Sequence, residues 1–345
     1  MTSVAQAPAP SAASPSDHPT PERILGAFNA HERTAALLAA IELELFTAIG
    51  EGATTTEALA KRTGAAERGV RILADFLVVD GFLTKRAGNY GLSPDAAAFL
   101  DQRSPMYLGS ISRFLGNPDF LRRYGRLTEA VRRGGSVEEN HMVVPQQPLW
   151  VEFARGMAAM QAPVAGLVAE AVGRAERVLD LAAGHGLFGI AVARANPGAT
   201  IIAQDWEEVL AVARENAERA GVADRVRLLP GSAFEVDFGE GLDLVLVPNF
   251  LHHFDPPTCV GLLRRIYDAL APGGRVAIVE FVPDPSRVSP PMPAAFSLKM
   301  LVTTPAGDAY TFAEIERMCR EAGFTGMEHS PLGPAPQSLV LAHRG

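Results

Sequence analysis

The chain has 345 residues, and its 31 Lys and Arg against 39 Asp and Glu give a net charge of −8 at pH 7. A general nucleic-acid surface needs a basic face, so this balance argues against one. The two cysteines, Cys259 and Cys319, stand in no CxxC pair or histidine cluster, which argues against a disulfide framework and a metal site. No apolar run approaches the ~20 residues of a membrane span. We therefore expect a cytoplasmic protein without a metal, with neither nucleic acid nor a membrane as partner.

The N-terminal part of the chain divides into a tail and a helical block. Residues 1–20 are rich in Ala, Pro and Ser without a basic start, and they are predicted to be a disordered tail rather than a signal peptide. In the block of residues 21–103, apolar residues recur at helical spacing over Ile24–Leu45, and a further predicted helix covers Glu67–Val79. Between them the sequence TTTE, at residues 54–57, is a helix-start signal.

A hairpin is predicted after these helices, because GFLTKRAGNYGLSP places turn residues around Gly88 between two short apolar runs. Helices followed by a hairpin are typical of a winged-helix domain, a fold that often binds DNA. Between Glu57 and Arg86, however, six basic residues stand against four acidic ones, and no basic recognition face emerges. We therefore predict that residues 21–103 serve in packing or dimerisation.

Residues 104–175 are predicted to be a helical linker that also carries pocket-lining helices. A polar stretch, GGSVEENHMVVPQQP, interrupts the helical pattern at 134–148. Phe153, Met157 and Met160 follow one another at helical spacing, which puts them on one face of a helix. Such a stripe is either core or the wall of an apolar substrate pocket.

From residue 176 onward, short apolar runs alternate with helical segments. The candidate strands are RVLDLA, TIIAQD, RVRLLPG, LDLVLVP and RVAIVEFV, and the turn APGG is expected to end a helix before the fifth strand. Near-continuous apolar runs indicate strands covered on both faces, hence a mainly parallel sheet. FTGMEHSP and QSLVLAHR, joined by LGPAP, predict two further strands that pair with each other and cap the sheet edge. Residues 176–345 are therefore predicted to form an α/β domain with a doubly wound, mainly parallel, seven-stranded sheet.

The stretch from Arg177 to Asp205 indicates strand, tight turn, helix and strand, the nucleotide-binding half of such a fold. Within it GHGLFG matches the glycine fingerprint of dinucleotide-binding proteins, but Asp180 before the loop would be a poor neighbour for a negatively charged pyrophosphate. S-adenosylmethionine carries an ammonium and a sulfonium and no phosphate, so the same carboxylate suits it. The small residues of AAGHG let the backbone approach a ligand, and Asp205 can accept hydrogen bonds from ribose hydroxyls. We therefore predict S-adenosylmethionine as the cofactor.

Together these motifs resemble the family of S-adenosylmethionine-dependent small-molecule O-methyltransferases that includes the caffeic acid and acetylserotonin enzymes. The resemblance covers residues 22–345 and rests on LDLAAGHG, AQD, PGSAFE, NFLHHFD, PGGRVAIVEF and TTPAGDAYT. It implies an N-terminal winged-helix dimerisation domain, a Rossmann-like catalytic domain and a homodimer. It also implies transfer of a methyl group from S-adenosylmethionine to a hydroxyl of a small aromatic metabolite.

The same resemblance implies roles for individual residues. His252 matches the family's general base, and Glu280 matches the glutamate that orients it. A phenol with a pKa of about 10 is mostly protonated at neutral pH, so a histidine that takes its proton can speed methyl transfer. The cofactor-binding residues that the resemblance implies are Ala182, Gly184, Gly186, Asp205, Trp206, Ser232, Ala233, Phe234 and Asn249. The substrate-contacting residues that it implies are Phe153, Met157, Met160, His253, Met300, Thr304 and Asp308.

Three positions depart from the family pattern. His253 replaces the usual aspartate after the base, Ser232 replaces the usual adenine-facing aspartate, and Ala309 replaces a second glutamate near the base. Asp308, beside Ala309, is the candidate for that missing carboxylate. If the backbone at His252 and His253 is extended, the two side chains point to opposite sides and only one of them faces the methyl donor.

These departures leave alternatives open. Within the same fold the enzyme could methylate carbon or nitrogen, or it could use S-adenosylmethionine in a reaction without methyl transfer. From other classes, the chain could be a ligand-sensing winged-helix DNA-binding protein or an NAD-dependent oxidoreductase. Asp180 and the lack of a second catalytic domain argue against the oxidoreductase.

Overall fold

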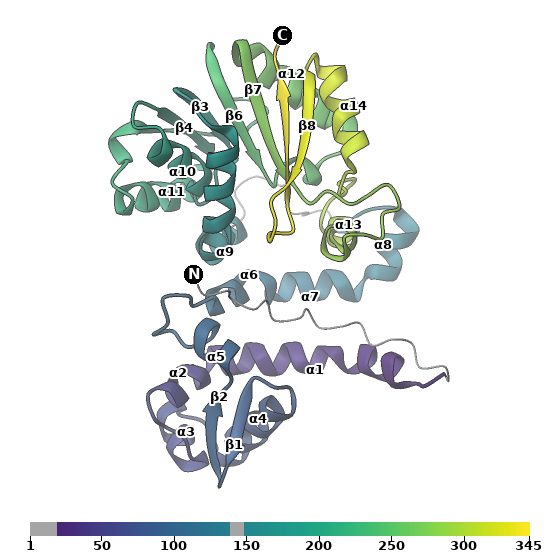
Figure 1. Cartoon of the computed structure of the whole chain (residues 1–345). Helices are drawn as coiled ribbons and strands as arrows, with labels where there is room; N and C mark the ends of the chain where they lie inside the picture. Colours follow the sequence, from purple (N-terminus) through teal and green to yellow (C-terminus); the bar gives the residue numbers. More distant parts are fainter. Residues whose placement is uncertain (1–18, 139–147) are drawn as a thin grey trace, which may run out of the picture. The chain divides into compact units, whose positions relative to one another are not determined.

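The computed structural model describes residues 19–138 and 148–345. The chain divides into two compact units, Met1–Pro105 and Met106–Gly345 (Figure 1). Nearly all of the predicted tail, residues 1–20, lies outside the described residues, and so does most of the predicted interruption at 134–148.

The N-terminal unit is a helical module with one small hairpin. Its helices are α1 (Glu22–Glu42), α2 (Leu45–Gly50), α3 (Thr56–Thr63), α4 (Glu67–Val79) and α5 (Pro94–Phe99), and its strands are β1 (Leu83–Arg86) and β2 (Asn89–Leu92). The Thr55 hydroxyl accepts a hydrogen bond from the Ala58 amide at 3.2 Å, which begins α3 at the predicted helix-start signal. Ala87 and Gly88 both have positive φ and form the predicted turn between the antiparallel strands.

One predicted helix of this unit is divided in two. The expected helix over Ile24–Leu45 ends at Glu42, and Glu44, with a φ of 54°, turns the chain into α2. The turn lets the apolar face of α2 pack inward, and every residue of α2 from Leu45 to Ile49 is buried. The core of the unit includes the nearly inaccessible side chains of Phe46, Leu59, Leu77 and Tyr90.

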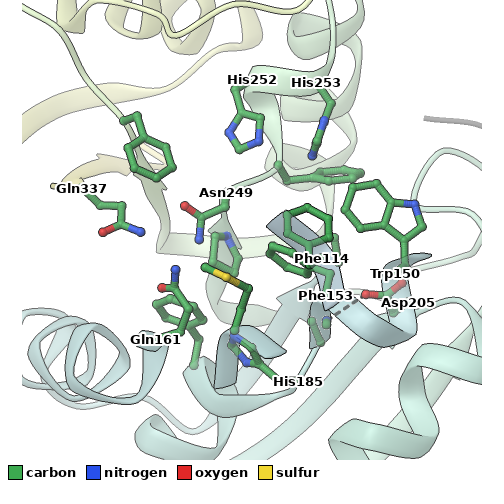
Figure 2. Close-up of a pocket in the computed structure, with 18 of the residues that line it drawn as sticks. Phe114, Trp150, Phe153, Gln161, His185, Asp205, Asn249, His252, His253 and Gln337 are labelled. Atoms are coloured by element: carbon green, nitrogen blue, oxygen red, sulfur yellow. Dashed lines mark hydrogen bonds between the residues drawn. The ribbon is translucent and has the colours of Figure 1, made fainter. Parts of the chain in front are cut away.

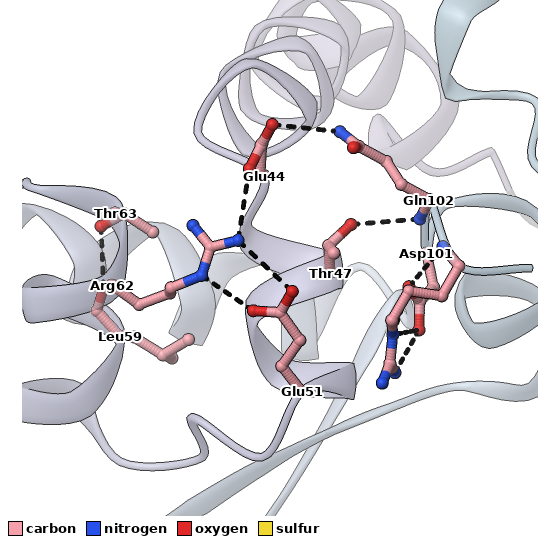
Figure 3. A network of polar contacts seen from close by, with 9 residues as sticks. Glu44, Thr47, Glu51, Leu59, Arg62, Thr63, Asp101 and Gln102 are labelled. Carbon is pink, nitrogen blue, oxygen red and sulfur yellow. Dashed lines mark hydrogen bonds and ion pairs between the residues drawn. The ribbon is translucent and has the colours of Figure 1, made fainter.

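A network of polar contacts joins α2, α3 and the segment after α5 (Figure 3). The Arg62 guanidinium on α3 donates to Glu51 at 2.8 Å and to Glu44 at 3.4 Å. The backbone N–H of Gln102 donates to the Thr47 hydroxyl at 3.1 Å. Solvent screens such exposed ion pairs, so the apolar core provides most of the stability of this unit.

In the C-terminal unit, short helices precede one long helix. The elements are η1 (Gly109–Ile111), α6 (Ser112–Leu115), α7 (Pro118–Gly125), α8 (Leu127–Arg133) and α9 (Pro148–Val172). Phe114 on α6 meets Phe120 and Phe153 edge to face, with ring centroids 5.0 and 4.9 Å away. These aromatic contacts pack α6 and α7 against the first half of α9.

The rest of the unit is built on a seven-stranded sheet. Its strands are β3 (Arg177–Leu181), β4 (Thr200–Asp205), β5 (Val226–Pro230), β6 (Leu242–Pro248), β7 (Leu270–Glu280), β8 (Thr325–Pro331) and β9 (Ser338–His343). Their order across the sheet is β5-β4-β3-β6-β7-β9-β8. Strands β3 to β7 pair in parallel, and β9 runs antiparallel to β7 and β8. The predicted mainly parallel sheet, with the last two strands at its edge, is therefore confirmed.

Helices cover both faces of this sheet (Figure 1). They are α9, α10 (Leu187–Ala195), α11 (Glu207–Arg219), α12 (Pro256–Ala269) and α14 (Phe312–Ala322). The helix α13 (Pro291–Thr303) packs instead with α7 and α8, and two short turns are η2 (Ala223–Arg225) and η3 (Leu251–His253). Leu244 and Leu246 of β6 pack with α9 and α10, whereas Val245 and Val247 pack with α12 and α14. The strand order reverses between β3 and β6, and ligands of such sheets bind at the carboxyl ends of the strands beside this reversal.

One strand boundary differs from the prediction. The sequence predicts APGG, residues 271–274, as a turn before the fifth strand, whereas β7 begins earlier, at Leu270. Leu270 already pairs with β6, and regular pairing resumes at Arg275. The residues between them bulge from the ladder, with Gly273 at a φ of 76°. Turn-forming residues therefore mark a bulge inside a strand here rather than a loop.

Candidate active site

The loop after β3 presents its backbone to a cavity. Ala182 and Gly184 have positive φ angles of 49° and 57°, and Gly186, at a φ of 72°, begins α10. A Cβ on Gly186 would lie 2.9 Å from the Cβ of Ala213 on α11, so a side chain there would force the loop away from the helix. The loop can therefore approach a ligand closely with its main chain.

Asp205 ends β4 and holds this loop. Its carboxylate accepts backbone N–H groups from Gly184 at 2.8 Å and from Trp206 at 2.7 Å. An ionised carboxylate has about four acceptor positions, so Asp205 keeps acceptor capacity for a ligand in the cavity that it lines. Burial raises the pKa of Asp205 to about 6, and the group is ionised above that pH.

Asp180 lies away from the cavity, which corrects the expectation that it would be a neighbour of the cofactor. Its side chain is fully buried and accepts the N–H of Gly189 on α10 at 2.8 Å. A Cβ on Gly189 would lie 2.9 Å from this carboxylate, so helix and strand are packed closely. Burial raises the pKa of Asp180 to about 7. Asp180 therefore anchors α10, and the aspartate that faces the cavity is Asp205.

The cavity has a volume of about 800 Å³ and is lined by residues that end or follow the parallel strands. Figure 2 shows some of its lining side chains. Small-molecule sites typically enclose about 300–1,000 Å³. Of the predicted cofactor-binding residues, its wall includes Ala182, Gly184, Asp205, Trp206, Ser232, Ala233, Phe234 and Asn249. Gly186 does not line the wall and acts instead through the turn that it permits.

The polar groups at this end of the cavity fit S-adenosylmethionine. The side-chain oxygens of Gln161 and Asn249 are buried and have no hydrogen-bond partner among the described residues. Together with the Asp205 carboxylate they are acceptors, and S-adenosylmethionine offers donors in its ribose hydroxyls and its α-ammonium. Figure 2 shows Gln161, Asn249 and Asp205 around one cavity. A buried polar atom without a hydrogen bond destabilises the folded protein, and hydrogen bonds from these donors would remove that penalty.

A buried histidine and glutamate form the second polar feature. His252 lies in η3 after β6, and its Nδ1 lies 2.6 Å from Oε2 of Glu280 at the end of β7. The backbone N–H of His252 also donates to Oε1 of Glu280 at 3.3 Å. Both side chains are almost fully buried, and His252 lines the cavity. The carboxylate holds Nδ1 and leaves Nε2 as the ring nitrogen available to a ligand.

His253 lines the same cavity as His252, because the backbone there is not extended, the condition under which the two side chains would point to opposite sides. Their ring centroids are 4.3 Å apart, because η3 is a helical turn rather than extended backbone. His253 meets Trp150 edge to face at 5.4 Å, and its Nδ1 has no hydrogen-bond partner in the described part of the chain. Burial, with the charge of His252, holds the pKa of His253 well below its usual range. His253 is therefore neutral at pH 7.

Much of the remaining cavity wall is apolar and aromatic. Of the predicted substrate-contacting residues, it includes Phe153, Met157, Met160, His253 and Met300. Phe296 on α13 lies edge to face with His252 at 4.9 Å and stacks on Phe281 at 4.1 Å. An acceptor with an aromatic ring would find complementary ring faces and edges here.

Thr304 and Asp308 do not line the cavity, contrary to prediction. The buried Thr304 hydroxyl donates to the Met300 carbonyl at 2.8 Å and accepts the Gly307 N–H at 2.9 Å, so it closes the end of α13. Asp308 pairs with Arg287 at 3.0 Å at a partly exposed position. The Asp308 carboxylate is therefore paired with Arg287 outside the cavity and does not replace the missing second glutamate.

Several residues that line the cavity were not predicted from the sequence. They are Gln161, His185, Phe281, Phe296, Lys299, Thr303 and Gln337. Gln161 follows Met157 by one helical turn, so extending the stripe on α9 would have found it. His185 stands inside the AAGHG motif, and burial lowers its pKa to about 4. The others come from segments that only the folded chain brings together.

Both cysteines are buried and free. Across residues 19–138 and 148–345, no three His, Cys, Asp or Glu side chains gather where they could hold a metal ion. Over the same ranges, no helix has the length and apolar character needed to cross a membrane.

Two protein families match the chain. Residues 126–325 match the O-methyltransferase domain, and residues 25–102 match the O-methyltransferase dimerisation domain. The tetracenomycin polyketide synthesis 8-O-methyl transferase of Streptomyces glaucescens is 30% identical over 322 residues, which are 90% of this chain and 92% of that relative.

Solved structures share the whole fold. A protein from Nostoc punctiforme is 47% identical and superposes with a TM-score of 0.92, covering 94% of this chain and 100% of that one. Human N-acetylserotonin methyltransferase, solved in complex with S-adenosylmethionine, is 25% identical with a TM-score of 0.83, covering 96% of this chain and 100% of that one.

Proposed function

Because the chain belongs to the family of S-adenosylmethionine-dependent O-methyltransferases, we propose that it methylates a hydroxyl of a small aromatic metabolite with His252 as general base. The observation that carries this proposal is the buried pair of His252 and Glu280 in the wall of the cavity that also reaches the loop after β3. One cavity thus offers a cofactor site, a proton acceptor and an aromatic wall.

The residues near the loop would hold the cofactor. Asp205 would accept from the ribose hydroxyls, and the segment of Ser232, Ala233 and Phe234 would lie along the adenine. When bound, S-adenosylmethionine supplies a methyl group attached to a positively charged sulfur. The close backbone at Gly184 and the acceptor groups of the wall support this placement.

His252 would remove the proton from the acceptor hydroxyl. The Glu280 carboxylate at 2.6 Å favours the tautomer with hydrogen on Nδ1, so Nε2 keeps its lone pair toward the cavity. The same carboxylate stabilises the imidazolium that forms when Nε2 takes the proton. A base placed in this way contributes about 10²–10⁴-fold to the rate.

The apolar wall would orient the acceptor. The rings of Phe281 and Phe296 lie beside His252, and Phe153 adds a further ring to the cavity wall. Stacking and edge contacts hold an aromatic acceptor in one plane, which reduces the cost of aligning its oxygen with the transferring methyl group. Human N-acetylserotonin methyltransferase, with the same fold, is named for an aromatic acceptor.

A panel of candidate acceptors tests the proposal. Purified protein is incubated with methyl-labelled S-adenosylmethionine and matched phenols, anilines, aromatic carboxylates and thiols, and the products are identified by mass. We expect label on phenolic oxygen, with one S-adenosylhomocysteine formed per methyl group transferred. Transfer to nitrogen or carbon with every phenol unmodified would contradict the proposed acceptor chemistry.

We also propose that the protein is a homodimer through its N-terminal unit. This unit matches the dimerisation domain, and α1 leaves Ile24, Leu25 and Phe28 exposed by 61%, 55% and 72%. Light scattering should give the mass of two chains for the wild type and of one chain for Phe28→Glu. Val79→Glu, at an exposed site at the end of α4, should stay dimeric. A wild-type mass of one chain at micromolar concentration would contradict the dimer.

A further inference from the structure

Lys299 is a cation in the cavity wall, and no carboxylate of residues 19–138 and 148–345 forms an ion pair with it. It lies on α13 beside Met300, and it is the one Lys or Arg among the described residues that line the cavity. Burial lowers the pKa of Lys299. A nearby carboxylate would raise this pKa again, and no described acidic side chain does so. In the N-terminal unit, by contrast, Lys85 forms an ion pair with Asp75. A half-buried ammonium in apolar surroundings is costly unless an anion compensates it.

The position of the ammonium favours the cavity over solvent. A lysine can rest its stem on apolar surface and send its charge into water. Here, however, Nζ lies 5.5 Å from the ring centroid of Phe296, which itself lines the cavity. The attraction between a cation and a ring face keeps the charge at the wall.

Phe296 also connects Lys299 to the proposed reaction centre. The Phe296 ring lies 4.9 Å from the His252 ring. The ammonium and the imidazole are thus neighbours of the same aromatic ring. An acceptor lying against Phe296 can present its hydroxyl to His252 and a second substituent to Lys299.

The charged side chains of the cavity wall indicate whether the substituent that faces Lys299 is an anion or a cation. The acidic side chains of the described wall are Asp205, the last residue of β4, and Glu235, in the segment after β5, both at the cofactor end. Glu280 is engaged with His252. We propose that the methyl acceptor carries a carboxylate that Lys299 binds, so that the substrates are hydroxylated aromatic acids. This inference rests on the proposed function and specifies its substrate class.

The first test compares acids with their neutral esters. Values of kcat and KM are measured for 3- and 4-hydroxybenzoate and for their methyl esters, in the wild type, Lys299→Met and Lys299→Arg. We expect the wild type to favour the acids and Lys299→Met to lower the acid-to-ester ratio of kcat/KM by about 10- to 100-fold, as for a charged hydrogen bond. The loss should lie in KM, because the contact is the same in ground and transition states. Lys299→Arg should keep the preference, and so should Lys61→Met, an exposed control on α3.

A binding measurement separates this inference from the proposed function. The complex with S-adenosylhomocysteine is titrated with 2-naphthoate and with 2-naphthalenemethanol, neither of which has a phenolic hydroxyl. We expect Lys299→Met to raise the Kd of 2-naphthoate by about 10- to 100-fold relative to that of the alcohol. If this holds while no phenol is methylated, the proposed function fails and the role of Lys299 stands. If the wild type binds both ligands equally, or if Lys299→Met leaves their ratio unchanged, the inference is overturned.

Discussion

Changing His252 to glutamine is expected to lower kcat for a phenolic acceptor by about 10²–10⁴-fold, the usual contribution of a positioned general base. Glutamine retains polar atoms in the wall but has no basic nitrogen. The affinity for S-adenosylhomocysteine, measured by calorimetry, should change little, because the cofactor end of the cavity is built from other residues. The rates are measured as O-methylated product formed over time.

Three companion variants make this result specific. Glu280→Gln should also lower kcat, and the double variant should lose little more than His252→Gln alone, because both residues act through one imidazole. His329→Gln is the matched control, since His329 stacks on Phe312 and does not line the cavity. Turnover at the wild-type rate in purified, folded His252→Gln would remove the general-base role.

Changing Asp205 to asparagine should weaken binding of S-adenosylhomocysteine by about 10- to 100-fold, the effect of losing hydrogen bonds to a charged acceptor. The substitution also disturbs the loop, because an amide cannot accept the N–H groups of both Gly184 and Trp206 as the carboxylate does. Calorimetry on the wild type, Asp205→Asn and Asp224→Asn checks this, with Asp224 as an exposed control in η2. An unchanged Kd in Asp205→Asn would place the ribose elsewhere.

The same carboxylate predicts how binding depends on pH. Burial raises the pKa of Asp205 to about 6, so the free protein carries this group protonated below that pH. Ribose hydroxyls favour the ionised form, so affinity should be constant above about pH 7 and should fall as the pH drops through about 6. The difference between the wild-type and Asp205→Asn profiles reports the linkage through the Asp205 carboxylate, including its effect on Asp180, whose pKa the charge of Asp205 raises. A wild-type Kd that is flat from about pH 8 to about pH 5 would contradict this linkage.

Local patterns predict most of the fold. The helix over Glu67–Val79 has the predicted bounds, and each apolar run after residue 176 becomes a strand of the sheet. These features depend on neighbours in sequence: apolar periodicity, turn residues and helix starts. One exception is the helix over Ile24–Leu45, which Glu44 divides in two. Another is APGG, where the backbone freedom of glycine serves a bulge in β7 rather than a loop. Composition alone does not distinguish these two uses of the same residues.

Long-range contacts explain where the site differs from prediction. Asp308 is next to the position of the family's second glutamate in the sequence. In the structure, however, its carboxylate accepts a hydrogen bond from Arg287, which is 21 residues away. His253 turns into the cavity because η3 is a helical turn, which the pair of histidines does not reveal. Lys299 has no motif around it, and its significance depends on the absence of an acidic neighbour among the described residues. Such pairings are set by the tertiary fold.

The most direct test of His252 uses two acceptors with the same ring skeleton. One is an ordinary phenol, protonated at neutral pH, and the other is a nitrophenol that is already ionised at the assay pH. A general base is needed only for the first. We expect His252→Gln to lose about 10²–10⁴-fold in kcat with the ordinary phenol and less than about tenfold with the ionised one. Equal losses with both acceptors would contradict proton removal by His252.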